Sequence, residues 1–359
     1  MRIGLDITKA IDPRDGVGNY TAELTRALLA LDSDDEILLY SLSQKVDPAA
    51  LDAQFPNRPA RSELRPDTRP QDDGVDLFHV TSFAFPTGFA GRTVFTCYDL
   101  TFLTHPECHT LGNKVACMTG TLEAVLRGAE FVAISEASAN DLRTLLDVDG
   151  ERIHVVHPAA APVFEPRPAE DARQRMAQRF DLSGDYILAV GTLEPRKNLR
   201  RLIEAYAGLP DDVRQRFPLV LAGGKGWKMD EEELQRQGAR RLGFVPVDDL
   251  VDLYSAATVF AYPSLAEGFG LPVLEAMTCG APVLTSNVSS MPEVAGNAAR
   301  VVDPLDVGAI RRDLAELLKD EDERQRLRAL GQRRATEFSW TRAAERIHAL
   351  YHSNNKEAE

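Results

Sequence analysis

One stretch of the chain combines two carboxylates with two glycines. Glu267 stands immediately before Gly268-Phe269-Gly270, and Glu275 follows eight positions after Glu267. Glycines let a backbone approach a ligand closely, and the N–H groups at a helix start favour an anion such as phosphate. Carboxylates beside a phosphate are costly unless they accept hydrogen bonds from neutral hydroxyl groups, which ribose and hexose supply. The combination predicts a nucleotide-sugar site.

The elements around this stretch should hold both carboxylates in one crevice. Apolar runs at 259–261 and 283–285 predict two strands with a helix between them. Pro272, which has no N–H, suits the first helical position, and Gly280 suits a left-handed stop, so the helix should last about two turns. Glu275 would then lie in the first turn, where stabilisation of the helix dipole explains it as well as ligand binding does.

A second stretch places two cations at the start of a helix. The segment 186–198 predicts a buried strand that ends near Gly191 and runs into a polar turn carrying Arg196 and Lys197. A guanidinium offers a planar fork to phosphate oxygens and an ammonium offers a point charge, so the pair suits a diphosphate. A basic pair that only faces solvent is the alternative.

Both strings resemble those of the family 4 retaining glycosyltransferases, which have the GT-B fold. The stretch from Glu267 to Glu275 matches the family's Glu-x7-Glu signature, and 191–198, Gly-Thr-Leu-Glu-Pro-Arg-Lys-Asn, matches its donor-phosphate motif. The resemblance implies that Glu275 holds the ribose of the donor and that Arg196 and Lys197 hold its phosphates. It also implies that the transferred sugar is held by Glu267 and by the backbone of Gly268, Phe269, Gly270 and Leu271.

The beginning of the chain carries another glycine pair. An apolar run at 2–7 is followed by a loop with Gly16 and Gly18 and by a helical pattern from Tyr20. The loop lacks the full Gly-x-Gly-x-x-Gly fingerprint of dinucleotide-binding folds. The resemblance implies that it faces the acceptor and the donor phosphates, whereas a plain tight turn is the alternative.

The chain departs from the family pattern at one catalytic position. Tyr98 stands where the family usually has histidine, and Asp99 follows it as in the family. The family histidine contacts the donor sugar near C6, so the resemblance makes both residues catalytic candidates and leaves only the side-chain role of Tyr98 in question. We hypothesise that the donor is either a 6-deoxy sugar, whose methyl group packs against the Tyr98 ring, or a sugar that is held less tightly at C6. His105, seven positions later, is expected to be a partly buried structural residue.

Two further segments are expected beside the donor. A strand at 131–135 ends in Ser135, which either lines the crevice or only caps the following helix. Another strand, near 240–245, is followed by a proline and a helix. The resemblance places Phe244 and Val245, at the end of that strand, beside the nucleotide base.

Length and composition limit the classes of function. The 359 residues suffice for two domains, and the net charge of −14 argues against a nucleic-acid partner. No apolar run approaches the ~20 residues that span a bilayer, and the first residues predict a strand, so we expect a cytoplasmic protein. Peripheral contact with the inner face of a membrane stays open. The four cysteines lack the spacing of a zinc site or a disulfide framework.

The expected fold is α/β, with two doubly wound Rossmann-like GT-B domains that face each other across a cleft. The acceptor-binding domain would cover 1–163 and the nucleotide-sugar-binding domain 170–337, with a helix at 338–352 crossing back to the first domain. A Pro- and Ala-rich linker separates the domains. Residues 43–74 predict an irregular connection around weak secondary structure, and 353–359 predict disorder.

The predicted reaction is retaining transfer of a hexosyl group from a nucleotide-diphosphate sugar to a hydroxyl of a glycan, a lipid-linked glycan or a small molecule. Mannose from GDP-mannose is the first expectation, because similar motifs occur in mannosyltransferases of polysaccharide assembly, and a 6-deoxyhexose is the second. No metal or other cofactor is expected, since the Arg196 and Lys197 pair supplies positive charge and no Asp-x-Asp pair appears near the glycine loop. The alternatives are a donor-binding protein that has lost transfer activity and a GT-B sugar-nucleotide epimerase.

Overall fold

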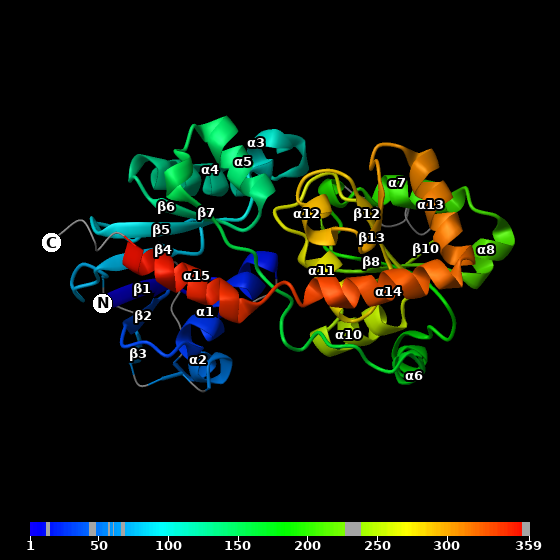
Figure 1. The fold of residues 1–359 in the computed structure, drawn as a ribbon, viewed down its shortest axis with the longest axis horizontal. Helices are drawn as coiled ribbons and strands as arrows, with labels where there is room; N and C mark the ends of the chain where they lie inside the picture. Colours follow the sequence, from blue (N-terminus) through cyan, green and yellow to red (C-terminus); the bar gives the residue numbers. More distant parts are fainter. Residues whose placement is uncertain are drawn as a thin grey trace. The chain divides into compact units, whose positions relative to one another are not determined.

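The chain divides into two compact units, which we describe separately. A computed structural model describes residues 1–11, 15–42, 48–56, 58–59, 61–65, 69–226 and 238–353. Unit 1 comprises Met1–Pro158 and Ser339–Glu359, and unit 2 comprises Ala159–Phe338 (Figure 1). The predicted disordered tail falls largely outside the described residues. Among the described residues, no helix has both the length and the apolar content needed to cross a bilayer.

Unit 1 is built on a parallel sheet of seven strands in the order β3-β2-β1-β4-β5-β6-β7. Its central strands are buried except for Arg92 at the start of β5, which is why they appear in the sequence as mostly apolar runs. The strands are β1 Arg2–Asp6, β2 Glu36–Tyr40, β3 Ser62–Leu64, β4 Leu77–Val80, β5 Arg92–Cys97, β6 Glu130–Ala133 and β7 Ile153–Val155.

Helices cover both faces of this sheet (Figure 1). One face carries α1 Gly16–Ala30 and α15 Trp340–Ser353, which pack on each other, and the other carries α4 Leu111–Leu126 and α5 Glu136–Leu146. The remaining elements are α2 Pro48–Gln54, α3 Thr101–Thr104 and the short helices η1 Pro106–Cys108 and η2 Gly150–Arg152. α15 follows unit 2 in sequence but belongs to unit 1, as expected for the last helix. Its expected packing face is buried and consists of Trp340, Ala344, Ile347 and Tyr351.

Unit 2 contains a parallel sheet of six strands in the order β10-β9-β8-β11-β12-β13. The strands are β8 Ile187–Val190, β9 Leu219–Ala222, β10 Ala239–Gly243, β11 Val259–Tyr262, β12 Val283–Ser286 and β13 Ala299–Val302. The helices are α6 Ala169–Phe180, η3 Pro195–Lys197, α7 Leu199–Ala207, α8 Asp211–Arg216, α10 Val247–Ala256, α11 Leu271–Thr278, α12 Met291–Ala295, α13 Val307–Lys319 and α14 Glu321–Ala335. α7 pairs with α13, and α11 pairs with α14.

Two expectations about the first half were wrong. The glycine pair does not lie in a loop: Gly16 opens α1, and the side chain of Asp15 caps the helix by accepting from the Gly18 N–H at 2.8 Å. The strand expected as the sixth of this half, β7, is the seventh. The reason is that the polar stretch after β2, expected to hold only weak secondary structure, contains the short strand β3 as well as α2.

Candidate active site

The carboxyl ends of β8 and β11 form the topological switch point of the unit 2 sheet. Chain order runs from β8 to β10 on one side of this point and from β11 to β13 on the other. In open parallel sheets, ligands bind outside the carboxyl ends of the strands at such a point. η3 with Arg196 and Lys197 follows β8, and the loop with Glu267 follows β11. The two stretches that the sequence singled out therefore meet here.

Glu267 contacts both cations. Its Oε2 accepts a hydrogen bond from the guanidinium of Arg196, and its Oε1 accepts one from Nζ of Lys197 at 2.9 Å. Arg196 also donates to Oε1 of Glu194 at 2.7 Å, and Nζ of Lys197 lies 3.9 Å from the same oxygen. Glu267 is 6% exposed and Glu194 is 7% exposed. The switch point thus holds a nearly buried cluster of two cations and two carboxylates.

Tyr262, the last residue of β11, completes the cluster. Its hydroxyl accepts from Nζ of Lys197 at 2.5 Å and donates to Oε1 of Glu267 at 2.9 Å. Nζ of Lys197 also lies 5.0 Å from the centre of the Tyr262 ring, within reach of a cation–π interaction. The phenol therefore fixes the distance between the ammonium group and the carboxylate.

The charges of the cluster determine how Glu267 titrates. Burial alone would raise its pKa, but the charges of Arg196 and Lys197 outweigh burial and lower the pKa to about 2. Burial and the neighbouring Glu267 charge raise the pKa of Tyr262 well above its ordinary value. At neutral pH the carboxylate is therefore ionised and the phenol is neutral.

Asn198 holds the cation turn in place. It has a left-handed backbone with φ of 57°, which asparagine tolerates better than most residues. Its amide donates to the carbonyl of Pro263 at 3.0 Å and to that of Pro304 at 2.7 Å. The Arg196 carbonyl also accepts from the Leu265 N–H at 2.9 Å. These bonds tie the turn after β8 to the loops after β11 and β13.

Two serines hold the backbone of the glycine loop by hydrogen bonds. Oγ of Ser289 accepts from the Glu267 N–H at 3.0 Å and lies 2.7 Å from the Glu267 carbonyl, and Oγ of Ser290 lies 2.8 Å from the Phe269 carbonyl. Gly270 has φ of 101°, and a Cβ there would lie 2.2 Å from the side chain of Met291. The loop conformation therefore requires glycine at this position.

Glu275 lies deeper in α11 than the sequence predicted. α11 begins at Leu271, so Pro272 is its second residue and Glu275 is in its second turn. Because dipole stabilisation falls off within the first turn, it does not account for this carboxylate. Oε2 of Glu275 accepts from the hydroxyl of Tyr254 at 3.0 Å. Burial raises the pKa of Glu275 to about 7, although Tyr254 and the charge of Lys197 counteract it.

Three more predicted donor residues lie at the same edge of the unit 2 sheet. Gly191 has φ of 136°, and a Cβ there would lie 3.3 Å from Cε of Lys197, so its lack of a side chain makes room for the lysine stem. Phe244 follows β10 and is 73% exposed, whereas Val245 is 8% exposed. β10 is separated from β8 by one strand, or about 10 Å, which is in the range between the diphosphate and the base of a nucleotide.

Tyr98 is covered by unit 1 itself. It is 7% exposed, its hydroxyl donates to the Thr81 carbonyl at 2.6 Å, and its ring packs edge to face on Tyr20 with centroids 5.2 Å apart. The expected contact between this ring and a sugar methyl group therefore finds little exposed surface. Asp99 is partly buried, and its Oδ1 accepts from the N–H and the hydroxyl of Thr101 at 2.9 and 2.6 Å.

Ser135 is a helix cap. Its Oγ accepts from the Ser138 N–H at 3.0 Å and lies 3.1 Å from Oγ of Ser138. The side chain is fully buried. Of the two expected roles, lining the crevice and capping the helix, the structure therefore favours the cap. Ser138 in turn donates to the Tyr98 carbonyl at 2.8 Å. His105 ends α3 and is partly buried, as expected.

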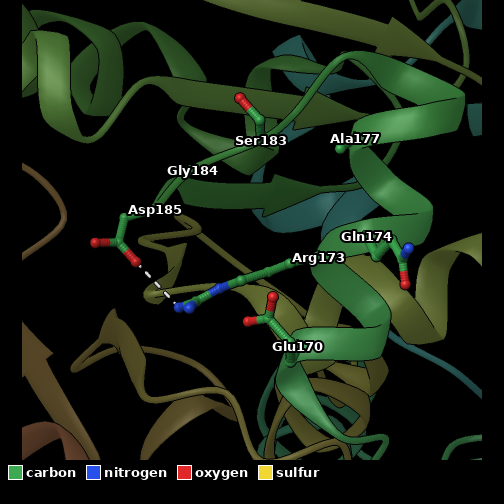
Figure 2. A pocket seen from close by; sticks show the side chains of 7 residues that line it. All are labelled: Glu170, Arg173, Gln174, Ala177, Ser183, Gly184 and Asp185. Atoms are coloured by element: carbon green, nitrogen blue, oxygen red, sulfur yellow. Dashed lines mark hydrogen bonds and ion pairs between the residues drawn. The ribbon is translucent and has the colours of Figure 1, made fainter.

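A surface hollow elsewhere in unit 2 is not part of this site. Figure 2 shows residues of α6 and of the segment before β8 around it, with Arg173 reaching toward Asp185 at 3.0 Å. Asp185 precedes β8, so the hollow lies at the amino end of the strands. Ligands of parallel sheets bind at the opposite end.

Sequence reasoning missed five of the residues that build the site. Tyr262 ends a strand and Tyr254 lies in a helix, and tyrosine in either position is ordinarily a core residue. Glu194 lies inside the recognised motif, and its proximity to Arg196 was the available signal. The paired serines before α12 gave none.

Comparisons with known proteins agree with this architecture. A family model described as "Glycosyl transferases group 1" matches residues 170–334. O-antigen chain mannosyltransferase B of Escherichia coli is 36% identical, over 91% of this chain and 93% of that protein. Sucrose-phosphate synthase of Thermosynechococcus elongatus has a TM-score of 0.75 at 20% identity and covers 98% of both chains. Anabaena HepE, solved with UDP and glucose, also has a TM-score of 0.75, at 17% identity over 98% of this chain and 100% of that one.

The two kinds of similarity support different statements. At 20% identity and below, the solved structures establish the fold alone. The E. coli relative is similar along nearly the whole length of both proteins, and the family model spans most of unit 2. The chain therefore belongs to the glycosyl transferases of group 1 and has their GT-B fold.

Proposed function

We propose that this glycosyltransferase moves a mannosyl group from GDP-mannose to a hydroxyl of a growing glycan, with retention at the anomeric carbon. The similarity to an O-antigen chain mannosyltransferase supports mannose as the sugar and a polysaccharide as the acceptor. A 6-deoxyhexose is the second candidate for the sugar, and a lipid-linked glycan or a small molecule is the second candidate for the acceptor.

The observation that carries the proposal is the pairing of Arg196 and Lys197 with Glu267 at the switch point. Both cations bond to Glu267. A donor diphosphate that binds them therefore has to displace this carboxylate, and not only water. When phosphate oxygens take over these bonds, Glu267 becomes an acceptor for hydroxyls of the transferred sugar. The same cluster thereby serves both parts of the donor.

The cations then act on the leaving group. Cleavage of the sugar–phosphate bond leaves negative charge on the diphosphate, and fixed positive groups in a site of low exposure stabilise that charge. Glu267 is a poor candidate for a nucleophile because two cations hold it and keep its pKa at about 2. Retention therefore proceeds by front-face attack, with a leaving phosphate oxygen accepting the proton of the acceptor hydroxyl.

The nucleoside part of the donor extends toward β10. Glu275 accepts hydrogen bonds from the ribose hydroxyls, and the backbone at Phe244 and Val245 borders the base. A neutral hydroxyl can donate to a carboxylate, whereas a second carboxylate or a phosphate cannot. Glu275, whose pKa of about 7 reflects burial without a direct cationic hydrogen-bond partner, fits that role.

Transfer is proposed to need no divalent metal, because Arg196 and Lys197 supply the charge that a metal supplies in other transferases. Activity should persist after exhaustive chelation. Loss of activity that Mg²⁺ or Mn²⁺ restores would contradict this mechanism.

Product analysis separates the proposal from its alternatives. The protein is incubated with GDP-mannose, a GDP 6-deoxyhexose and UDP-sugars, each with mannose-containing oligosaccharide acceptors, and the products are analysed by mass spectrometry. We expect a mannosyl-extended acceptor and GDP. A changed sugar nucleotide without acceptor would indicate an epimerase, and donor binding without any product would indicate a binding protein.

We further propose that unit 1 makes peripheral contact with a membrane through α4. Its large apolar side chains face outward at helical spacing: Leu111 is 74%, Val115 56%, Met118 39%, Leu122 43% and Leu126 86% exposed. Its buried residues are instead small, namely Cys117, Gly120, Thr121 and Ala124. An outward apolar stripe of this kind marks an interaction surface.

The stripe's size favours a lipid surface over a second copy of the chain. Sixteen helical residues give a face about 24 Å long and about 10 Å wide, whereas a stable dimer buries about 800 Å² per partner. Sedimentation with lipid vesicles tests this. Leu111→Gln combined with Leu126→Gln should abolish binding, and Leu145→Gln, which alters an exposed leucine of α5, should not. A dimer in solution that the double variant dissociates would contradict the membrane role.

A further inference from the structure

Asp35, His348 and His352 converge in unit 1. Asp35 precedes β2, and the two histidines are four residues apart on one side of α15. Nε2 of His348 lies 2.7 Å and Nε2 of His352 lies 2.8 Å from the same oxygen, Oδ2 of Asp35. One atom from each side chain lies within 4.8 Å of the other two. Only seven histidines occur in the chain, so the convergence of two on one carboxylate is not a consequence of abundance.

The surroundings complete a set of ligand atoms. Oγ of Ser33 lies 3.1 Å from Oδ2 of Asp35 and 3.0 Å from Nε2 of His348. The other oxygen of Asp35, Oδ1, accepts from the amino group of Met1 at 2.7 Å, which fixes the orientation of the carboxylate. Oδ2 therefore faces two imidazole nitrogens and one hydroxyl at once. A cation bound among these groups would replace the hydrogen bonds between them and keep the nitrogen and oxygen atoms as its ligands.

The ligand types select the ion. Two imidazole nitrogens and one carboxylate oxygen are the donors of zinc sites and of related first-row metals, whereas Ca²⁺ and Mg²⁺ prefer sites made of oxygen alone. Zinc–ligand bonds of about 2.0–2.2 Å place neighbouring ligand atoms roughly 3.3–3.5 Å apart. The two nitrogen–oxygen separations, 2.7 and 2.8 Å, would therefore open by roughly 0.5–0.8 Å when the ion binds, a shift within reach of side-chain rotation.

We propose that Asp35, His348 and His352 bind one divalent transition-metal ion of the Zn²⁺ class. The side chains of His348 and His352 are 28% and 41% exposed, so the ion can reach the site from solvent and keep a position for water. The bound ion would join α15 to the segment before β2. Because α15 lies in the segment of unit 1 that follows unit 2 in sequence, the metal would fasten this helix to the rest of its unit.

The test uses the full chain after removal of metals by a chelator. Calorimetric titration with Zn²⁺ should give saturable binding of one ion per chain, and thermal unfolding should shift to higher temperature with Zn²⁺. Co²⁺, used as a spectroscopic probe, should give visible absorption bands of a site with nitrogen ligands. His348→Gln and His352→Gln should each weaken Zn²⁺ binding at least tenfold and remove the Co²⁺ bands.

His154→Gln is the matched control. His154 is also a partly exposed histidine of unit 1 paired with a carboxylate, Glu130 at 2.9 Å, but among the described residues it belongs to no group of three possible metal ligands. This variant should bind Zn²⁺ as the unaltered protein does. Absence of saturable binding to the unaltered chain, unchanged binding in folded His352→Gln, or equal weakening by His154→Gln would each overturn the proposal. None of these measurements depends on transferase activity.

Discussion

The two units place a buried carboxylate at equivalent points of similar sheets and give it opposite properties. In unit 1 chain order reverses between β1 and β4, and Asp6, the last residue of β1, lies at that point. Its oxygens accept from the N–H and hydroxyl of Thr8 at 2.9 and 2.6 Å and from the Ser82 N–H at 2.9 Å. In unit 2 the corresponding carboxylate is Glu267, whose partners include Arg196 and Lys197.

The hydrogen-bond and ion-pair partners of each carboxylate decide in which direction its pKa shifts. Burial raises the pKa of Asp6, since neutral donors offset the loss of water only in part. Two cations lower that of Glu267 to about 2 despite burial. The fold therefore determines where a carboxylate lies, and the adjoining turns determine its chemistry. We infer that the switch point of unit 2 is reactive and that Asp6 mainly joins β1 to β4.

The comparison is tested most strongly at Lys197. Lys197→Ala removes a charge-assisted contact to the leaving phosphate and should reduce kcat/KM about tenfold to a hundredfold, or roughly 1.5–3 kcal/mol. Lys319→Ala, an exposed lysine at the end of α13, is the matched control and should leave activity unchanged. Circular dichroism and thermal unfolding establish that both variants fold. Unaltered turnover in folded Lys197→Ala would remove this residue from the mechanism.

Asp6→Asn should act on stability instead. The NH₂ group of asparagine would face N–H groups that now donate to the carboxylate, so buried donors would lose their acceptor. This loss should lower the free energy of unfolding by about 1–3 kcal/mol. Denaturant unfolding measures this change, and turnover per folded molecule should be unaffected. If the variant is as stable as the unaltered protein but inactive, Asp6 is catalytic and the contrast between the units fails.

Glu275 offers a further test, through the pH dependence of the free energy of unfolding. Its pKa of about 7 lies above the ordinary value of 4.5, so between these pH values the folded protein binds more protons at this group than the unfolded chain. The contribution of Glu275 to stability is therefore greatest below pH 4.5 and declines as pH rises to about 7. Between pH 5 and pH 8 the free energy of unfolding of the unaltered protein should therefore fall by about 2–3 kcal/mol relative to that of Glu275→Gln, which lacks the titrating group. Parallel pH dependence of the two proteins would contradict the raised pKa.

The sequence was informative where local patterns carry the structure. Buried parallel strands appear as continuous apolar runs, so β8 and β11 could be predicted, and the glycines and prolines around α11 bounded that helix well. The short strand β3 was missed because its three residues, Ser-Glu-Leu, have no such run. Gly16 and Gly18 were assigned to a loop because glycine usually marks one, whereas the cap by Asp15 begins the helix there.

The contacts within the site depend on tertiary structure that no local pattern shows. Tyr262 and Lys197 are 65 residues apart, and Asn198 and Pro304 are 106 residues apart. The sequence identified Arg196, Lys197 and Glu267 as functional but gave them a ligand as their partner, whereas the structure shows that they bond to one another. Which cation meets which carboxylate follows only from the strand order, which sets the loops after β8 and β11 side by side.

The smallest expected effect concerns Tyr98, where a sugar-reading role and a packing role predict different outcomes. The hydroxyl donates to the Thr81 carbonyl, and the residue is 7% exposed. Tyr98→Phe keeps the ring and removes only that hydrogen bond, so it should lower the free energy of unfolding by about 0.5–1.5 kcal/mol. Because the hydroxyl is directed into unit 1, the ratio of kcat/KM for matched 6-hydroxy and 6-deoxy donors should stay the same, and Tyr98→His should change it no more than Tyr98→Phe does. A shift of that ratio toward 6-hydroxy donors in Tyr98→His alone would show that position 98 does read C6, since a site that hydrogen-bonds a hydroxyl discriminates far more strongly than one that merely tolerates its absence.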